Sequence, residues 1–137
     1  MSEKLVIQSY QGSYTVFFEK KNIEELVSSF GRKSHFLIDA NVARLYKTNL
    51  SVILEHPSTI IIEAIEENKS IENLLPVFER LVRDGVRRDE PLVAIGGGII
   101  QDITCFIAST LFRGFLGTLF QQPCWPKQTH VLVQRAQ

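Results

Sequence analysis

Apolar residues recur along this chain with two different spacings, and each spacing predicts one kind of element. Near the start, residues 5–7 and 14–18 are rich in strand formers, and a Gln-Gly-Ser stretch separates them. This pattern predicts a β-hairpin. Short, almost wholly apolar runs are typical of buried strands, and three of them follow: His35–Ile38, which ends at Asp39, then Thr59–Ile62 and Leu92–Ile95.

Between these runs the apolar residues lie three and four positions apart, which favours helices. Four helices are predicted from caps and stops: one after Asn22 that Gly31 ends, a short one over residues 42–46, one capped by Ser70 and ended by Gly85, and one over residues 99–110. The third is predicted to pack through one apolar face, made of Ile71, Leu74, Leu75, Phe78, Leu81 and Val82.

Strands and helices that alternate in this way indicate the α/β class. We therefore expect a Rossmann-like, mostly parallel sheet with flanking helices, preceded by a β-hairpin. No internal repeat is present in the sequence.

Composition narrows the function classes. The 137 residues carry 15 basic and 15 acidic side chains, with 45% hydrophobic and 22% charged residues, which is ordinary for a globular protein. A zero net charge argues against a nucleic-acid partner held by a basic surface. No apolar run approaches the ~20 residues of a membrane span, the start lacks a signal-peptide pattern, and Cys105 and Cys124 form no Cys-x-x-Cys pair. We expect a cytoplasmic protein that binds neither nucleic acid nor membranes.

The three glycines Gly96-Gly97-Gly98 lie between a predicted strand and a predicted helix. Without β-carbons, their backbone is open to close approach by a ligand, and the first amides of the helix favour an anion such as a pyrophosphate. A tight turn without a ligand is the alternative interpretation. The stretch is no P-loop, because Ile-Ile-Gln follows where Lys-Ser or Lys-Thr is needed, and G-x-G-x-x-G fails at its third glycine, where Gln101 stands. Asp102, expected in the first turn of the helix, either caps the helix dipole or faces a hydroxyl, amide or metal.

Three motifs resemble those of one enzyme family. Residues 96–102, with the following Phe-Arg-Gly at 112–114, resemble the G-G-G-x-x-x-D and R-G signature of 3-dehydroquinate synthases and related sugar phosphate cyclases. Residues 39–46 match D-x-N-V-x-x-L-Y, and residues 65–72 are similar to G-E-x-x-K-S-x-E, although Ile65 replaces the usual glycine. The resemblance covers about residues 4–114, the amino-terminal half of that family. The G-G-G-x-x-x-D motif alone is shared with iron-type alcohol and glycerol dehydrogenases.

The resemblance implies an NAD site. It assigns Asp39 and Asn41 to the adenosine end, and Glu66 and Lys69 to the same dinucleotide site. Gly97 and Gly98 would hold the pyrophosphate, and Asp102 would lie near the nicotinamide. The residues themselves leave other interpretations open. Asp39 and Asn41 can shape a turn, and Glu66 and Lys69 can form a solvated ion pair.

The family reaction is a step of the shikimate pathway of aromatic amino acid biosynthesis, in which an NAD-assisted cyclisation of a sugar phosphate eliminates phosphate. The resemblance makes the protein a carbon–oxygen lyase and a homodimer, with NAD and a sugar phosphate as its small-molecule partners. The metal of the full-length enzyme, usually zinc, is held by one Glu and two His of a second domain. This chain stops short of that domain, so we expect no catalytic or metal-binding residue in it and no activity alone. Its His35, His56 and His130 lack metal-ligand spacing. The alternatives are another cyclase, an iron-type dehydrogenase fragment or a non-catalytic nucleotide-binding module.

The tail differs from the rest of the chain. From Phe115 to Gln137 there is no acidic residue, and five glutamines and the only Trp lie there. Read one base out of frame, Cys124-Trp125 forces Leu and Trp125-Pro126 forces Ala, and the shifted frame can spell the family's next segment, T-T-L-L-A-Q-A-D-S. We therefore expect residues 1–114 to form the NAD-binding domain and residues 115–137 to be a frameshifted, non-homologous tail. The incomplete sheet is then expected to leave the helix over residues 99–110 poorly covered.

Overall fold

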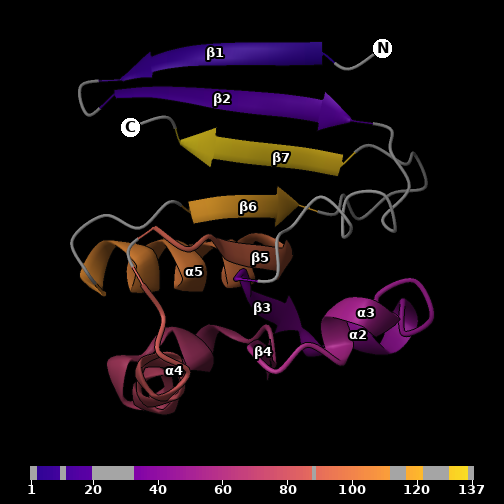
Figure 1. Ribbon diagram of the computed structural model, residues 1–137, viewed down its shortest axis with the longest axis vertical. Coiled ribbons are helices and arrows are strands. Elements are labelled where there is room, and N and C mark those ends of the chain that lie inside the picture. The colour runs from indigo at the N-terminus through magenta and orange to yellow at the C-terminus, as the bar shows by residue number, and fades with distance from the viewer. Residues whose placement is uncertain are drawn as a thin grey trace.

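The computed structural model describes residues 3–9, 12–19, 33–87, 89–111, 117–121 and 130–135. They form one seven-stranded sheet with helices on both sides (Figure 1). The strands are β1 (Glu3–Ser9), β2 (Gly12–Glu19), β3 (His35–Asp39), β4 (Thr59–Ile62), β5 (Leu92–Gly96), β6 (Gly117–Gln121) and β7 (His130–Arg135). The helices are α2 (Ala40–Leu45), α3 (Ser51–Leu54), the 3-10 turn η1 (Glu66–Lys69), α4 (Ile71–Arg83) and α5 (Gly98–Thr110).

The sheet has a parallel half and an antiparallel half. Its order is β1-β2-β7-β6-β5-β3-β4, in which the strands from β6 to β4 run parallel and those from β1 to β6 pair antiparallel. The predicted hairpin is confirmed as β1 and β2, and the predicted Rossmann-like arrangement is confirmed in the parallel half. The helix predicted after Asn22 lies outside the described residues.

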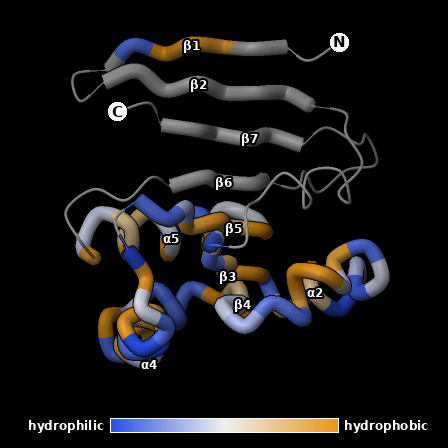
Figure 2. The backbone as a smooth tube through the Cα atoms, in the orientation of Figure 1, coloured by the Kyte–Doolittle hydropathy of each residue, from blue (hydrophilic) through white to orange (hydrophobic). Residues whose placement is uncertain are grey.

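Helices cover both faces of the parallel half because its strands are apolar on both sides. Leu37 of β3 and Ala94 of β5 pack under α4 and α5, whereas Phe36 and Val93 pack under α2 and α3. Each of these four side chains is at most 3% exposed. Full burial of a large apolar side chain stabilises a fold by about 1.5–3 kcal/mol. Figure 2 shows the corresponding hydrophobic stretches in β3 and β5.

Helix α4 begins and ends where its sequence predicts, but it packs through a different face. The Ser70 hydroxyl accepts a hydrogen bond from the Asn73 backbone N–H at 3.4 Å, and Gly85 ends the helix with φ +70°. The buried residues are Leu74, Val77 and Leu81. The prediction that Ile71, Leu75 and Val82 belong to the packed face is wrong, since they are 63%, 52% and 60% exposed. Val77 had no place in the predicted face, although it lies one turn from Leu74 and Leu81.

Helix α5 is well covered, which contradicts the expectation drawn from an incomplete sheet. Ile100, Ile103 and Ile107 are at most 1% exposed. The reason lies partly in the tail, where β6 pairs in parallel with β5 and extends the sheet beside α5. The tail has no clean sequence period, yet it contributes two strands, β6 and β7. Whether it is read in frame stays a prediction. Among the described residues, no helix has the length and apolar character needed to cross a membrane.

Candidate functional site at the carboxyl edge of the parallel strands

The seven predicted site residues lie at or just beyond the carboxyl ends of β3, β4 and β5. Pairing of Asp39 with Ile62, and of Ile38 with Ile95, brings these three strand ends level with one another. Ligands of open parallel sheets bind at this edge, because the loops that follow the strands and the helix N-termini converge there. The sheet register therefore gathers segments that are far apart in the sequence into one place.

The glycine turn contains two kinds of glycine. A β-carbon built on Gly96, where φ is +159°, would lie 2.9 Å from Asp39 Cβ and 3.0 Å from Ile100 Cγ1. Gly96 is therefore required by close packing between the end of β3 and the start of α5. A β-carbon on Gly97 or Gly98 would have no atom within 4 Å. These two glycines leave an open stretch of backbone rather than a tight protein contact.

The N-terminus of α5 lies at this open stretch. Its N-cap is Gly97, which offers no side-chain oxygen, and the first hydrogen bond within the helix joins Gln101 N–H to Gly97 O at 3.1 Å. The amides before Gln101 have no acceptor within the helix because of their position. In addition, the Gln101 side-chain nitrogen Nε2 is buried without a hydrogen-bond partner among the described residues. This arrangement is suited to an anion that can accept hydrogen bonds.

Asp39 caps the short helix that follows β3. Its Oδ1 accepts a hydrogen bond from the Asn41 backbone N–H at 2.8 Å. The interpretation that these two residues shape a turn is therefore confirmed for the Asp39 side chain and the Asn41 backbone. Asp39 is half-buried and Asn41 is exposed, and both follow the end of β3 next to the glycine turn.

Glu66, Lys69 and Asp102 form one cluster of charges. Lys69 Nζ lies 2.9 Å from Asp102 Oδ2 and 3.2 Å from Glu66 Oε2. The ion pair expected between Glu66 and Lys69 is confirmed, and the contact with Asp102 joins η1 to α5 across 33 positions of sequence. The Lys69 ammonium donates hydrogen bonds to Asp102 and to Glu66, and these bonds, the one to Asp102 most strongly, raise the pKa of Lys69 above its ordinary value.

The predicted position of Asp102 needs a correction. The helix begins at Gly98, so Asp102 lies in the second turn and not in the first, where no acidic residue occurs. It therefore does not cap the helix dipole. Its carboxylate contacts the Lys69 ammonium, and a role facing a ligand hydroxyl, amide or metal stays a prediction. With two carboxylates against one ammonium, the cluster carries a net negative charge, and Lys69 offsets part of the repulsion that Asp102 would exert on a nearby phosphate.

The described histidines, His35 and His56, contact other groups of the protein. His35 Nε2 lies 2.8 Å from Glu90 Oε2, and the His56 ring stacks edge-on against Phe36 with a centroid separation of 5.3 Å. The hydrogen bond to His35 holds the pKa of the Glu90 carboxyl below its usual range. Within the described residues, no three His, Cys, Asp or Glu side chains gather closely enough to share a metal ion. The side chain of His130 lies outside the described part of the structure.

Sequence reasoning missed the special role of Gly96 and the orphaned amide of Gln101. The sequence presents Gly96 only as part of a glycine run, since nothing in it shows that Asp39 packs against this residue. The sequence singles out Gln101 only because it stands where G-x-G-x-x-G needs its third glycine. For Gly96, the approach of Asp39 depends on the β3–β5 register, which joins segments more than fifty residues apart.

A parallel sheet with helices on both faces and an open glycine turn at a strand end defines the class of Rossmann-like α/β domains. Comparisons with known proteins show which family the chain resembles. Residues 59–123 match the family model of the 3-dehydroquinate synthase N-terminal region. This match extends past Gly114 into the tail.

Curated relatives agree with this family. The chain is 31% identical to 3-dehydroquinate synthase from Streptococcus thermophilus over 120 residues, which covers 81% of this chain and 34% of the relative. It is 37% identical to 3-dehydroquinate synthase from Thermococcus kodakarensis over 81 residues, or 59% of this chain and 24% of the relative. The chain thus spans between about a quarter and a third of the length of these relatives.

Solved structures agree as well. The 2-epi-5-epi-valiolone synthase of Streptomyces hygroscopicus, solved with NAD+ and Zn2+ bound, is 30% identical, with a TM-score of 0.55 over 63% of this chain and 25% of that one. A 2-deoxy-scyllo-inosose synthase at 18% identity shares the fold, with a TM-score of 0.63 over 88% of this chain and 36% of that one. The predicted resemblance to the amino-terminal half of the 3-dehydroquinate synthase and sugar phosphate cyclase family is therefore confirmed.

Proposed function

We propose that this chain binds NAD at the carboxyl edge of β3, β4 and β5. The observation that carries the proposal is the open backbone of Gly97 and Gly98 at the uncapped N-terminus of α5. A pyrophosphate needs backbone amides that it can approach closely and a helix end that favours negative charge. The buried, unpartnered Nε2 of Gln101 on the same helix offers a further donor for a ligand.

The remaining predicted residues have distinct parts in this proposal. Asp39 and Asn41, next to the turn, would contact the adenosine end, where ribose hydroxyls can donate to a carboxylate. Lys69, held by Glu66 and Asp102, would offset part of the repulsion between these carboxylates and the phosphates. Asp102 would lie towards the nicotinamide. When bound, NAD supplies a reversible hydride acceptor, and the residues of this chain bind and orient it.

The whole-protein activity that we propose is that of a 3-dehydroquinate synthase, a lyase of the shikimate pathway that cyclises a sugar phosphate with loss of phosphate. We assign no catalytic residue and no metal ligand to this chain, and we expect it to be inactive alone. Zinc use, a homodimer and a cytoplasmic location follow only from the family resemblance. A cyclase for a different sugar phosphate is the second candidate, supported by the 30% identity with 2-epi-5-epi-valiolone synthase.

Calorimetric titration with NAD tests the binding proposal. The unchanged chain should bind NAD, and Gly97→Val should abolish the heat of binding, because a branched side chain fills the open turn without meeting the protein itself. Thr110→Val, an exposed change at the far end of α5, is the matched control and should bind as the unchanged chain does. Equal affinity in all three proteins would contradict the proposed site. Thermal unfolding of each variant shows whether the fold is intact.

A further inference from the structure

Helix α4 carries a second apolar face that the sheet does not cover. Ile71, Leu75 and Val82 are 63%, 52% and 60% exposed, and Phe78 is half-buried. These residues follow one another at intervals of four, three and four positions, so they lie on one line along the helix. We refer to Ile71, Leu75, Phe78 and Val82 as the outer stripe of α4.

Helix α5 extends this apolar surface. Phe106 of α5 is 40% exposed, and its ring lies edge-on against the Phe78 ring with a centroid separation of 6.2 Å. The outer stripe and Phe106 therefore form one apolar surface that crosses from α4 to α5. Exposed surfaces of this kind, when polar residues border them, mark places where another molecule binds.

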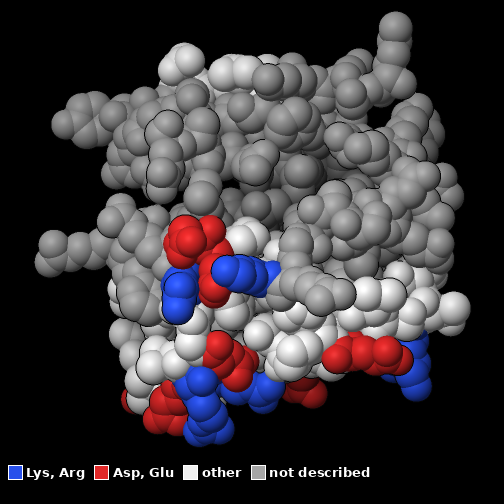
Figure 3. Space-filling model, viewed as in Figure 1, with Lys and Arg blue, Asp and Glu red and all other residues white. Residues whose placement is uncertain are grey.

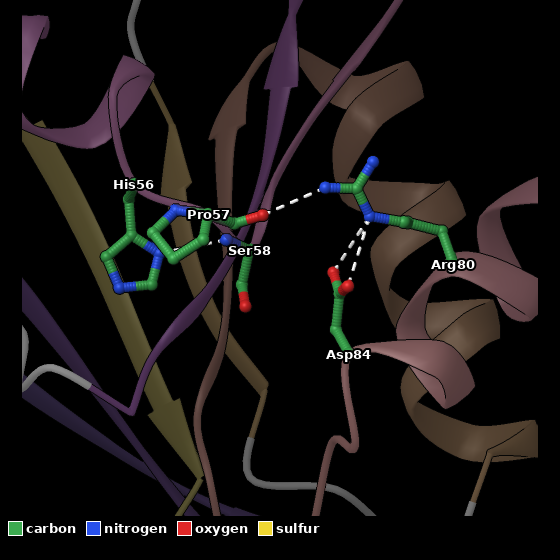
Figure 4. A network of polar contacts seen from close by, with 5 residues as sticks. All are labelled: His56, Pro57, Ser58, Arg80 and Asp84. Atoms are coloured by element: carbon green, nitrogen blue, oxygen red, sulfur yellow. Dashed lines mark hydrogen bonds and ion pairs between the residues drawn. The ribbon is translucent and has the colours of Figure 1, made fainter.

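Polar contacts near the carboxyl end of α4 keep the outer stripe turned away from the sheet. The Arg80 guanidinium donates to Pro57 O at 2.9 Å and to both carboxylate oxygens of Asp84 at 3.0 and 3.2 Å, as Figure 4 shows. The loop that carries Pro57 is held by a hydrogen bond from Ser58 N–H to His56 Nδ1 at 3.2 Å. The helix cannot rotate its outer stripe onto the sheet without breaking the bond to Pro57.

Acidic side chains border the apolar surface. Glu72, Glu79 and Arg83 each follow a residue of the outer stripe by one position, so they line one flank of it. All three are exposed, and within the described part of the chain none of them forms an ion pair. Near the amino end of the stripe, the cluster of Lys69 and its two carboxylates adds a further net negative charge. Figure 3 shows charged side chains gathered over α4 at the lower left.

We propose that the outer stripe and Phe106 dock a basic amphipathic helix of another polypeptide. Side chains at helical spacing interdigitate with a partner that repeats this spacing, and an extended strand with its period of two does not match it. Lysine or arginine side chains beside the partner's apolar face would meet Glu72 and Glu79. The net negative border disfavours an anionic lipid surface, and it also disfavours a second copy of this chain, which would bring an equal net charge.

Fluorescence anisotropy of labelled synthetic peptides, added to the full chain, tests this proposal. A Leu/Lys peptide as long as α4, with its Leu residues at helical spacing, should bind saturably. A scrambled peptide of the same composition lacks an apolar face and should bind at least about tenfold more weakly. A Leu/Glu peptide of the same pattern should also bind at least about tenfold more weakly, because the acidic border repels it. Equal binding of either comparison peptide would overturn the proposal.

Substitutions on the chain locate the binding surface. Leu75→Lys, in the middle of the outer stripe, should weaken binding of the Leu/Lys peptide at least about tenfold. Val52→Lys adds the same charge at a position 70% exposed on α3, which covers the opposite face of the sheet, and should bind as the unchanged chain does. Equal losses in the two variants would overturn the proposal. Circular dichroism should show that both variants keep the fold.

The charges of the border give a second test. Glu72→Lys combined with Glu79→Lys should reverse the preference, so that the Leu/Glu peptide binds more tightly than the Leu/Lys peptide. An unchanged preference would contradict the proposed role of the border.

Two other occupants of the outer stripe would also overturn the proposal. A dimer of the unchanged chain in sedimentation velocity that Leu75→Gln dissociates would assign the stripe to a second copy. Cosedimentation with phosphatidylserine vesicles that Leu75→Gln abolishes would assign it to a lipid surface.

Discussion

The middle and the end of strand β3 lie in different environments. Leu37 is fully buried under α4 and α5, whereas Asp39, two residues later, is half-buried and caps α2. Strand β5 and the turn after it repeat the contrast, since Ala94 is fully buried and Gly97, just beyond the strand, borders open space. In the interior a residue is selected for its apolar volume. At the carboxyl edge it is selected for the backbone groups it satisfies or leaves open, and the proposed ligand site consists of residues of this second kind.

The interior should respond most strongly to lost volume. Leu37→Ala should lower the free energy of unfolding by about 2–5 kcal/mol, because it removes buried apolar atoms and leaves a cavity. Urea denaturation measures the change. Val52→Ala, at a position 70% exposed, is the control and should change stability by less than about 0.5 kcal/mol. Similar losses in both variants would mean that the sheet interior is not packed as described.

The glycine turn lies between the buried interior and the open carboxyl edge. Substitution of Gly96 should therefore lower stability, whereas substitution of Gly98 should weaken ligand binding. Gly96→Ala should cost about 1–3 kcal/mol, because its β-carbon would collide with Asp39 and Ile100. Gly98→Ala should change stability by less than about 0.5 kcal/mol, since nothing lies within 4 Å. We expect Gly98→Ala instead to weaken NAD binding. Thermal unfolding and titration of both variants would reveal whether the division is real.

Removing the Asp39 cap at the end of β3 should lower the free energy of unfolding by a smaller amount. Asp39→Ala removes the acceptor for the Asn41 N–H and should cost about 0.5–2 kcal/mol. Asp39→Asn keeps an acceptor oxygen and should retain most of the stability. If the two variants lose the same amount, the charge of Asp39 matters more than its hydrogen bond.

The smallest effect concerns acid stability at the opposite end of the strands. Because the pKa of Glu90 is lowered from 4.5 in the folded chain, its ionised form stabilises the fold fully above that pH. This contribution is lost as the pH falls through the folded pKa. Glu90→Gln should therefore flatten the pH dependence of the unfolding midpoint below about pH 4.5 and reduce stability above it. An unchanged pH profile would show that the contact with His35 does not couple to folding.

Much of the described fold can be predicted from the sequence, because short apolar runs are typical of buried strands. The apolar runs at Thr59–Ile62 and Leu92–Ile95 predict β4 and all but the last residue of β5, and periodicity with caps predicts the helix between Ser70 and Gly85. The packed face of α4 was not predictable, because apolar residues occupy two neighbouring faces and only the sheet decides which one is covered. Strands β6 and β7 were missed because neither shows an alternating pattern, and their partners decide their conformation.

The residues of the candidate site can be named from the sequence, but the contacts among them cannot. The glycine run and the family motifs indicated Asp39, Lys69 and Asp102. Sequence alone could not show that Lys69 bridges to Asp102, because that contact depends on how η1 lies against α5. It could not separate Gly96 from Gly97 either, since the distinction comes from the approach of Asp39.

Amide chemical shifts recorded while NAD is added to the isotope-labelled chain test the central claim most directly. The account predicts saturable shifts concentrated at the amides of Gly97, Gly98 and the first turn of α5, with smaller ones at Asp39 and Asn41. Saturable shifts that leave the glycine turn untouched, or no shifts at all from a folded chain, would contradict it.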